Sequence, residues 1–153
     1  MKSLCFSFFF LSAALTGFAQ TADETAIKAV IEKEMQTRLD GDAEGRISCF
    51  ANEPYCLSVS YVAGQIYYFP NEKKDMMAKL NAQTSPIAYT GWTFKNDNYV
   101  THINGAMAFV QFTQTRTTPR GENFYFHSVR NLEKIDGAWK IVYLGSVMFT
   151  PED

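Results

Sequence analysis

The sequence predicts a single α+β domain in which one curved, mostly antiparallel sheet wraps around three helices. Three observations carry this prediction. The dipeptides Asp136-Gly137 and Asn104-Gly105 each stand between two runs of strand-forming residues, a pattern typical of tight hairpins with type I′ turns. The third observation is the order of the expected elements: two helices, two short strands, another helix and then long strands.

The first expected helix covers residues 23–40 and is amphipathic. Its apolar residues recur at helical spacing on one face: Ile27, Val30, Ile31, Met35 and Leu39. Thr21 with Glu24 indicates a capping box at the start of this helix. Asp42 is expected to cap a short second helix that extends to Phe50.

Two short strands are expected next, at residues 55–62 and 65–69, with a turn at 63–64 between them. A third helix is expected over residues 71–83, where Asn71 would be its cap. The rest of the chain is predicted to form the long strands, with one reversal at residues 119–121.

The two hairpins predict which side chains share a face, because opposed residues in antiparallel strands point to the same side. Counting outward from Asp136-Gly137 gives these inward-facing pairs: Lys134 with Trp139, Leu132 with Ile141, Arg130 with Tyr143, and Ser128 with Gly145. Counting from Asn104-Gly105 gives these: Thr101 with Ala108, Tyr99 with Val110, and Asp97 with Phe112.

Residues 1–19 are typical of a secretory signal peptide, with a charged start and an apolar centre. Gly17 and Ala19 place small residues at the positions that a signal peptidase reads, so we expect cleavage before Gln20. The alternative is a membrane anchor, but the apolar run is shorter than the roughly 20 residues needed to span a bilayer. The sequence therefore predicts an exported protein, periplasmic or secreted, whose single domain covers residues 20–153.

The overall charge argues against two classes of partner. The chain has a formal net charge of −2, and removing Lys2 with the leader would make it −3. Its basic residues are scattered rather than clustered along the sequence. A mildly acidic chain has no electrostatic reason to bind nucleic acid or an anionic membrane surface.

The residue types that bind metals or act as nucleophiles form no known pattern. His102 lies next to a turn and shares no close motif with His127, and there is no His-x-His, Cys-x-x-Cys or His-Glu-x-x-His, so we expect neither a metal nor a cofactor. Cys49 and Cys56 lie among apolar residues. Both a disulfide and two buried free thiols are compatible with their positions.

Several segments resemble the nuclear-transport-factor-2-like superfamily, also called SnoaL-like or ketosteroid-isomerase-like. Residues 38–44 (Arg-Leu-Asp-Gly-Asp-Ala-Glu) are similar to its helix-end segment, and residues 132–141 (Leu-Glu-Lys-Ile-Asp-Gly-Ala-Trp-Lys-Ile) to its final hairpin. Residues 52–55 (Asn-Glu-Pro-Tyr) and 104–108 (Asn-Gly-Ala-Met-Ala) resemble an exported bacterial branch with no assigned activity. The resemblance implies a cone-shaped domain, a shape that hosts isomerases, dehydratases, adaptors and binders alike.

Arg130 is the first candidate for a ligand contact. A guanidinium among apolar side chains needs acceptors, because an unpaired buried charge is costly. A ligand carboxylate or sulfate could accept from its planar fork, and a structural partner such as Asp97 or Glu53 could do so equally well. The predicted ligand-binding residues, all expected on the inner face or among the pocket aromatics, are Arg130, Tyr143, Tyr99, Trp92 and Ser128.

Asp97 is a weak candidate for catalysis. The resembling isomerases and dehydratases use a pocket carboxylate or histidine as base, with phenols that polarise a carbonyl, and Asp97 with Tyr99 or Tyr143 could imitate that pairing. Burial would raise the pKa of such a carboxylate toward the range of a proton shuttle. The polar run at residues 95–98 instead favours a solvated strand end or a bulge, which would reverse the faces.

Three functions are compatible with these observations. The preferred one is an exported domain that binds a small apolar or anionic organic molecule in a mostly apolar pocket, with Arg130 as anchor. The first alternative is a small enzyme of the isomerase or dehydratase type that uses a pocket carboxylate and a tyrosine. The second is a dimeric protein-interaction module with a filled cone.

Both long hairpins are expected to be apolar on their outer face as well. The residues concerned are Val129, Val142, Leu144, Val100, Met107 and Phe109. A sheet covered by helices on one face alone should be polar on the other. The pattern therefore predicts a homodimer that pairs through the outer sheet face.

Overall fold

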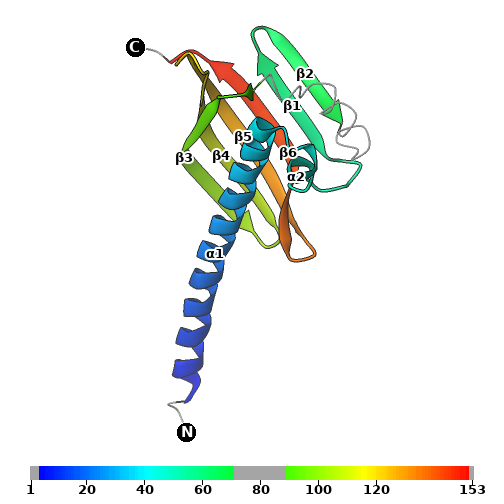
Figure 1. The fold of residues 1–153 in the computed structure, drawn as a ribbon. Coiled ribbons are helices and arrows are strands. Elements are labelled where there is room, and N and C mark those ends of the chain that lie inside the picture. Colours follow the sequence, from blue (N-terminus) through cyan, green and yellow to red (C-terminus); the bar gives the residue numbers. More distant parts are fainter. Residues whose placement is uncertain (1–3, 71–88, 152–153) are drawn as a thin grey trace.

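A long helix, α1 (Leu4–Asp40), crosses the concave face of a curved sheet in the computed structural model, which describes residues 4–70 and 89–151 (Figure 1). The predicted end of this helix is confirmed, but its predicted start at Asp23 is wrong. No proline interrupts the segment, so Thr21 and Glu24 lie within a continuous helix instead of capping one. In the described part of the chain, no helix is long and apolar enough to cross a membrane.

The second helix, α2 (Ala43–Ile47), turns the chain back toward the sheet. Its predicted cap is confirmed, since Asp42 Oδ1 accepts a hydrogen bond from the Gly45 backbone N–H at 2.8 Å. Ile47 and Phe50 are both buried, but the helix ends at Ile47 and not at Phe50 as predicted. The third predicted helix, at residues 71–83, lies outside the described residues.

Six strands form one mixed sheet in the order β2-β1-β6-β5-β4-β3. Their bounds are β1 Leu57–Val62, β2 Gln65–Pro70, β3 Thr93–Asn104, β4 Met107–Thr117, β5 Asn123–Ile135 and β6 Ala138–Phe149. Every neighbouring pair is antiparallel except β1 with β6, which is parallel. The prediction of a mostly antiparallel, curved sheet in a single α+β domain is therefore confirmed.

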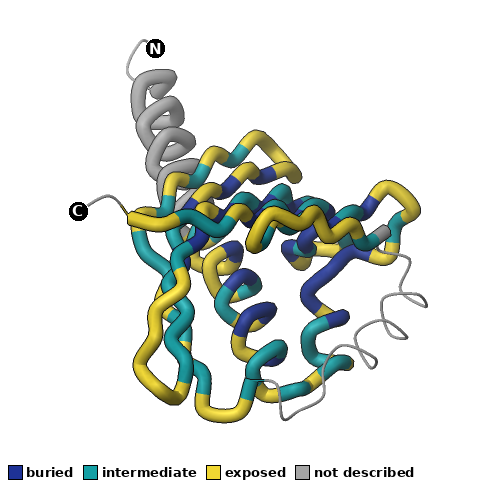
Figure 2. The backbone as a smooth tube through the Cα atoms, turned by 90° about the horizontal axis from the view of Figure 1, so that it is seen from above, coloured by how far each residue is buried: buried dark blue, intermediate teal, exposed yellow. Residues whose placement is uncertain are grey.

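The core lies between α1 and the part of the sheet nearest the two long hairpin turns. Ile27 and Ile31 of α1 are fully buried there, as the predicted stripe requires. They pack against sheet residues that alternate along β4, β5 and β6: Ala108, Val110, Phe112, Leu132, Trp139, Ile141 and Leu144. Figure 2 shows the same alternation of buried and exposed positions along the strands. This end of the concave face is thus filled by apolar side chains.

The β5–β6 hairpin is predicted correctly near its turn and incorrectly beyond it. Asp136 and Gly137 both have positive φ, 50° and 78°, and the pairing holds as far as Leu132 opposite Ile141. The register then shifts, so that Asn131 pairs with Tyr143. An extra residue in β6 causes this bulge, which reverses the faces of the residues that follow.

The bulge changes the neighbours of Arg130. Arg130 lies opposite Leu144 rather than Tyr143, and Ser128 lies opposite Ser146 rather than Gly145. Tyr143 therefore belongs to the outer face, away from Arg130. Leu144 and Val142, which were expected on the outer face, are buried.

The β3–β4 hairpin also differs from the prediction. Asn104 pairs with Met107, so the turn residues are Gly105 and Ala106, and each strand meets its partner two residues away from the expected position. Gly105 has a φ of 59°, whereas Asn104 has no positive φ and stays in the strand. A shift of two residues preserves the faces, because side chains alternate with a period of two.

A second bulge, between Asp97 and Val100, does change the faces at the far end of β3. Asn98 adopts a positive φ of 55° at this bulge. As a result Asn96 points inward opposite Gln114, and Asp97 points outward opposite Thr113. The predicted inward placement of Asp97 is therefore wrong, for the reason that the polar run had suggested.

Cys49 and Cys56 are both buried, free thiols. They pack in separate apolar clusters, Cys49 with the main core and Cys56 with Ala51 and Val142. Burial raises the pKa of each thiol, which keeps both in the neutral form. The alternative of two free thiols, rather than a disulfide, is the one that the structure shows.

Candidate functional site

A buried carboxylate on α1 organises the polar end of the concave face. Glu34 is only 1% exposed, and its two oxygens accept from two arginines: Oε1 from Arg46 Nε at 3.0 Å and Oε2 from Arg130 Nη2 at 3.2 Å. The ion-pair partner of Arg130 is therefore Glu34, not Asp97 or Glu53. Glu34 follows Ile31 by three residues on the buried face of α1, and this position in the apolar stripe is the sequence signal that could have identified it.

Two more arginines extend this group. Arg38, one helical turn after Glu34, donates from Nη2 to Tyr89 Oη at 3.0 Å. Arg116 on β4 donates from Nε to Gln114 Oε1 at 2.6 Å, and its guanidinium carbon lies 4.0 Å from the Phe126 ring centroid. We call these four residues the arginine cluster: Arg38, Arg46, Arg116 and Arg130. The pKa of Glu34 is lowered by Arg38, Arg46 and Arg130. The pKa of Arg116 is lowered by Arg38 and Arg130.

The shifts in pKa around the cluster have two causes, burial and the charges of the arginines. Burial raises the pKa of Glu34, but Arg46, Arg130 and Arg38 outweigh it and lower that pKa to about 2. Burial and the nearby Arg38 lower the pKa of Arg116 to about 9. Burial raises the pKa of Tyr89, but the cations of Arg38 and Arg116 outweigh it and leave that pKa below its ordinary value. The shifts of Glu34 and Tyr89 indicate an excess of positive charge, whereas burial is the largest cause of the Arg116 shift.

A chain of hydrogen bonds joins the arginine cluster to the edge of the sheet. Glu32 Oε1 accepts from Tyr99 Oη at 2.6 Å and from Asn96 Nδ2 at 3.0 Å. Asn96 Oδ1 accepts from Gln114 Nε2 at 2.8 Å, and Gln114 Oε1 accepts from Arg116 Nε. Both amide side chains are thereby held in one orientation. The inward turn of Asn96 at the β3 bulge makes this chain of contacts possible.

Three buried polar groups beside the cluster have no hydrogen-bond partner among the described residues. They are the Arg130 Nε and the hydroxyls of Ser128 and Ser146, which lie opposite each other across β5 and β6. A buried polar group without a partner typically costs about 1–3 kcal/mol. Unsatisfied groups of this kind are typical of a site that receives a polar ligand or water.

Aromatic side chains border the same end of the concave face. Trp92 stacks on Phe124 with ring centroids 5.9 Å apart and an interplanar angle of 21°. Tyr89 meets Trp92 edge-on, with centroids 5.8 Å apart. Phe124 lies directly opposite Arg116 across β4 and β5. We call Tyr89, Trp92 and Phe124 the aromatic wall.

The structure brings together part of the predicted ligand-binding set. Arg130 and Ser128 lie side by side on the inner face, and Trp92 borders the same end of the sheet. Tyr99 also faces inward and stacks on Phe112, and burial and its bond to Glu32 raise its pKa. Tyr143 is on the other face, because the β6 bulge reverses its direction.

Asp97 is separated from this site. Its carboxylate is 43% exposed and pairs with Lys95 at 2.9 Å. His102 and His127 are exposed as well. No described part of the chain gathers three or more His, Cys, Asp or Glu side chains that could hold a metal ion.

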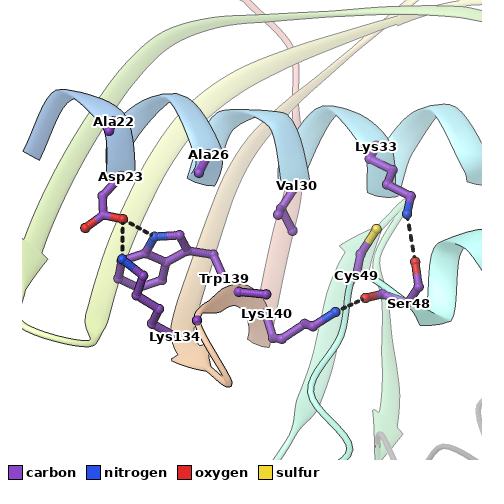
Figure 3. A pocket seen from close by; sticks show the side chains of 12 residues that line it. Ala22, Asp23, Ala26, Val30, Lys33, Ser48, Cys49, Lys134, Trp139 and Lys140 are labelled. Carbon is purple, nitrogen blue, oxygen red and sulfur yellow. Dashed lines mark hydrogen bonds and ion pairs between the residues drawn. The ribbon is translucent and has the colours of Figure 1, made fainter. Parts of the chain in front are cut away.

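A separate open cavity of about 610 Å³ lies between α1 and the tip of the β5–β6 hairpin (Figure 3). Asp23 closes one side, accepting from Lys134 at 2.7 Å and from Trp139 Nε1 at 2.9 Å, and Lys134 lies 5.6 Å from the Trp139 ring centroid as predicted. Lys33 and Lys140 both donate to Ser48. These three lysines already have hydrogen-bond partners within the protein. We therefore interpret their contacts around the cavity as structural ones that hold the hairpin against α1.

Comparison with solved structures identifies the fold. A protein from Novosphingobium aromaticivorans, described as NTF2-like with a cystatin-like fold, matches with a TM-score of 0.73 at 12% identity, covering 93% of this chain and 92% of that one. A protein of unknown function from Nostoc punctiforme with a cystatin-like fold matches with a TM-score of 0.66 at 15% identity, covering 84% of this chain and 92% of that one.

An NTF2-like protein of unknown function from Pseudomonas putida matches with a TM-score of 0.65 at 19% identity, covering 87% of this chain and 89% of that one. The chain has the NTF2-like, cystatin-like fold. No family profile and no curated protein matches the sequence. The NTF2-like fold is compatible with ligand binding and with isomerase-type activity, so the choice between them depends on the residues of the site.

Proposed function

We propose that this protein binds a small organic anion between α1 and the concave face of the sheet, at the arginine cluster. One observation carries the proposal: four neighbouring guanidinium groups lie around one buried carboxylate, Glu34, which forms ion pairs with only two of them. Arg46 and Arg130 use both oxygens of that carboxylate. Arg38 and Arg116 have only neutral partners among the described residues, a phenol and an amide.

This arrangement is unfavourable unless a further anion is present. Arg38 and Arg116 are half-buried, so each has lost part of its hydration without gaining a charged partner among the described residues. The guanidinium fork fits a carboxylate or sulfate in two parallel hydrogen bonds. The unpartnered hydroxyls of Ser128 and Ser146 and the Arg130 Nε would supply further donors. The site is therefore more polar than the mostly apolar pocket that the sequence predicted.

The proposal predicts that Arg116→Met weakens anion binding about 10- to 100-fold and leaves the fold intact. Arg116 has no ion-pair partner among the described residues, so its loss should cost no more than the roughly 1–3 kcal/mol of a Gln114 oxygen left without a donor. One charge-assisted hydrogen bond to an anion contributes about 1.5–3 kcal/mol, or about 10- to 100-fold in Kd. Isothermal titration calorimetry with sulfate and with small carboxylates measures this.

The matched control is Arg120→Met, which removes an exposed arginine from the β4–β5 turn. It changes the net charge by the same amount as Arg116→Met. Binding should be unchanged in that variant. A wild-type protein that binds none of these anions would contradict the proposal, and so would equal binding by both variants.

A second candidate function is an isomerase or dehydratase that moves a proton next to a carbonyl. The observation that favours it is the 2.6 Å hydrogen bond between Tyr99 and Glu32, a carboxylate and a phenol between α1 and the sheet. Glu32 would accept the proton, in the role that the sequence had suggested for Asp97. Hydrogen–deuterium exchange of ketone substrates by NMR tests this, and exchange that persists in Glu32→Gln would exclude it.

We also propose that the protein is exported and that it belongs to the exported SnoaL-like branch. The support for export is the pattern of residues 1–19, with small residues at positions 17 and 19. In this reading the domain that starts at Gln20 has no contact with the membrane. N-terminal sequencing of the protein recovered outside the cytoplasm should find Gln20, and recovery of Met1 there would refute the cleavage.

A homodimer through the outer sheet face is also proposed. Its support is the exposure of Val100 (55%), Met107 (59%) and Phe109 (43%) on the β3–β4 hairpin. The double variant Met107→Glu, Phe109→Lys should convert a dimer to a monomer in light scattering. Val142 and Leu144, which the sequence also placed on the outer face, are unsuitable for this test because they are buried and their substitution would affect folding. A monomeric wild type at micromolar concentration would rule the dimer out.

A further inference from the structure

We infer that the anion is a planar aromatic carboxylate, held at its carboxylate by Arg116 and Arg38 and at its ring by the aromatic wall. The inference rests on the proposed anion-binding function and specifies its ligand. Three observations carry it: the fixed orientation of Arg116, the position of Arg38, and the exposed rings beside them.

The hydrogen-bond chain determines how Arg116 presents its donors. Glu32 is an acceptor, so the Asn96 amide nitrogen must point to it and the Asn96 oxygen must accept from Gln114. The Gln114 oxygen is then left to accept from Arg116 Nε. No described residue bonds to the two terminal nitrogens of Arg116. Asn96 and Gln114 are thus positioning residues that aim a free pair of N–H donors at a planar acceptor.

Arg116 is also held from one side by an aromatic ring. Its guanidinium carbon lies 4.0 Å from the Phe126 centroid, so that ring covers one face of the group. Arg38 lies 5.3 Å from the Tyr89 centroid and bonds to its hydroxyl. The two cations repel each other, and a carboxylate between them would relieve that repulsion.

The aromatic wall supplies the surface for the rest of the ligand. Phe124 is 37% exposed and Trp92 is partly exposed, and both rings lie beside half-buried cations. Phe124 faces Arg116 from the neighbouring strand, and neighbouring strands lie about 4.8 Å apart. A carboxylate joined to an aromatic ring by a short linker spans such a distance. A flat ring would extend the stack of Trp92 on Phe124, a contact that favours aromatic over aliphatic groups.

The test compares four probes by calorimetry: phenylacetate, cyclohexylacetate, phenylacetamide and sulfate. Phenylacetate should bind about 3- to 10-fold more tightly than cyclohexylacetate, because stacking adds to burial. Phenylacetamide, which lacks the charge, should bind at least about 10-fold more weakly than phenylacetate. Sulfate should bind without contacting the wall.

Trp92→Leu should remove the preference for phenylacetate over cyclohexylacetate and leave sulfate binding unchanged. Phe124→Leu provides the same test should the first variant fold poorly. The chain has two tryptophans, and Trp139 is buried in the core, so phenylacetate should change the fluorescence of Trp92 alone. That change should be absent in the Trp92→Leu variant.

The outcomes separate this inference from the function on which it rests. Equal binding of phenylacetate and cyclohexylacetate to the wild type would overturn the aromatic assignment while the anion site stands. An unchanged preference in both Trp92→Leu and Phe124→Leu would do the same. Failure of every anion to bind would overturn both the proposed anion-binding function and the aromatic assignment.

Discussion

Glu34→Gln should lower the free energy of unfolding by about 3–5 kcal/mol. The amide has nearly the same shape but no charge, so Arg46 and Arg130 would be left buried without the carboxylate that each contacts. Urea unfolding at neutral pH, followed by circular dichroism, measures the change. No other acidic side chain in the described part of the chain is as deeply buried.

Glu44→Gln is the control for this substitution. Glu44 is an exposed carboxylate in α2, and its replacement should change the free energy of unfolding by no more than about 0.5 kcal/mol. Similar small losses in the two variants would show that Glu34 does not hold the cluster together.

The same carboxylate predicts how stability depends on pH. Its pKa is about 2 in the folded protein against 4.5 ordinarily, so its contribution is present above pH 4.5 and is lost as the pH falls toward 2. The full contribution is on the order of 3 kcal/mol. The urea midpoint of the wild type should fall more steeply across this window than that of Glu34→Gln.

Arg130→Met should lower the free energy of unfolding by about 3 kcal/mol. Methionine fills the space of the aliphatic stem, but Glu34 loses one of its two ion pairs while remaining buried. Arg46 still contacts Glu34, which keeps the loss at the lower end of the range for a broken buried pair. Chemical unfolding measures the loss, and the further destabilisation by acid should be smaller than in the wild type and complete at a higher pH, because a weaker positive potential raises the pKa of Glu34 toward its ordinary value.

This expectation replaces the one that the sequence supports. From the sequence, a change at Arg130 would weaken ligand binding and leave the fold intact. With Glu34 as its partner, Arg130 serves stability first. Arg120→Met is again the control, and an Arg130→Met variant as stable as that control would contradict the structural role of the pair.

Local patterns in the sequence were sufficient to find the described helices and strands, although not the start of α1 or the end of α2, and to place one of the two long turns. The apolar stripe of α1, the Asp42 cap and the Asp136-Gly137 turn each depend on residues close together in the chain. Positive φ at both turn residues follows from the preference of Asp-Gly for a type I′ turn. The resemblance of residues 38–44 and 132–141 to the NTF2-like superfamily agreed with the fold that was found.

The faces of the strands beyond the bulges depended on the tertiary structure. The bulge that separates Asn131 from Leu132 has no local signal in the sequence. The polar run at residues 95–98 indicated a bulge or a solvated strand end, but it did not decide between them or fix the faces around the bulge between Asp97 and Val100. Each bulge inserts a residue where the curved sheet must fit around α1, and each reverses every side chain that follows. For that reason Tyr143 and Asp97 were placed on the wrong face.

By itself, the sequence determined the α+β class, the order of the described helices and strands, and the choice of Arg130 as a residue to examine. These follow from short-range periodicity and from the cost of burying a charge. Only the tertiary structure decided what Arg130 contacts. Glu34 precedes it by 96 residues, and Arg116 and Arg38 come from a strand and a helix that meet only in the folded chain. Pairing between charges so far apart depends on the packing of whole elements, which no local pattern records.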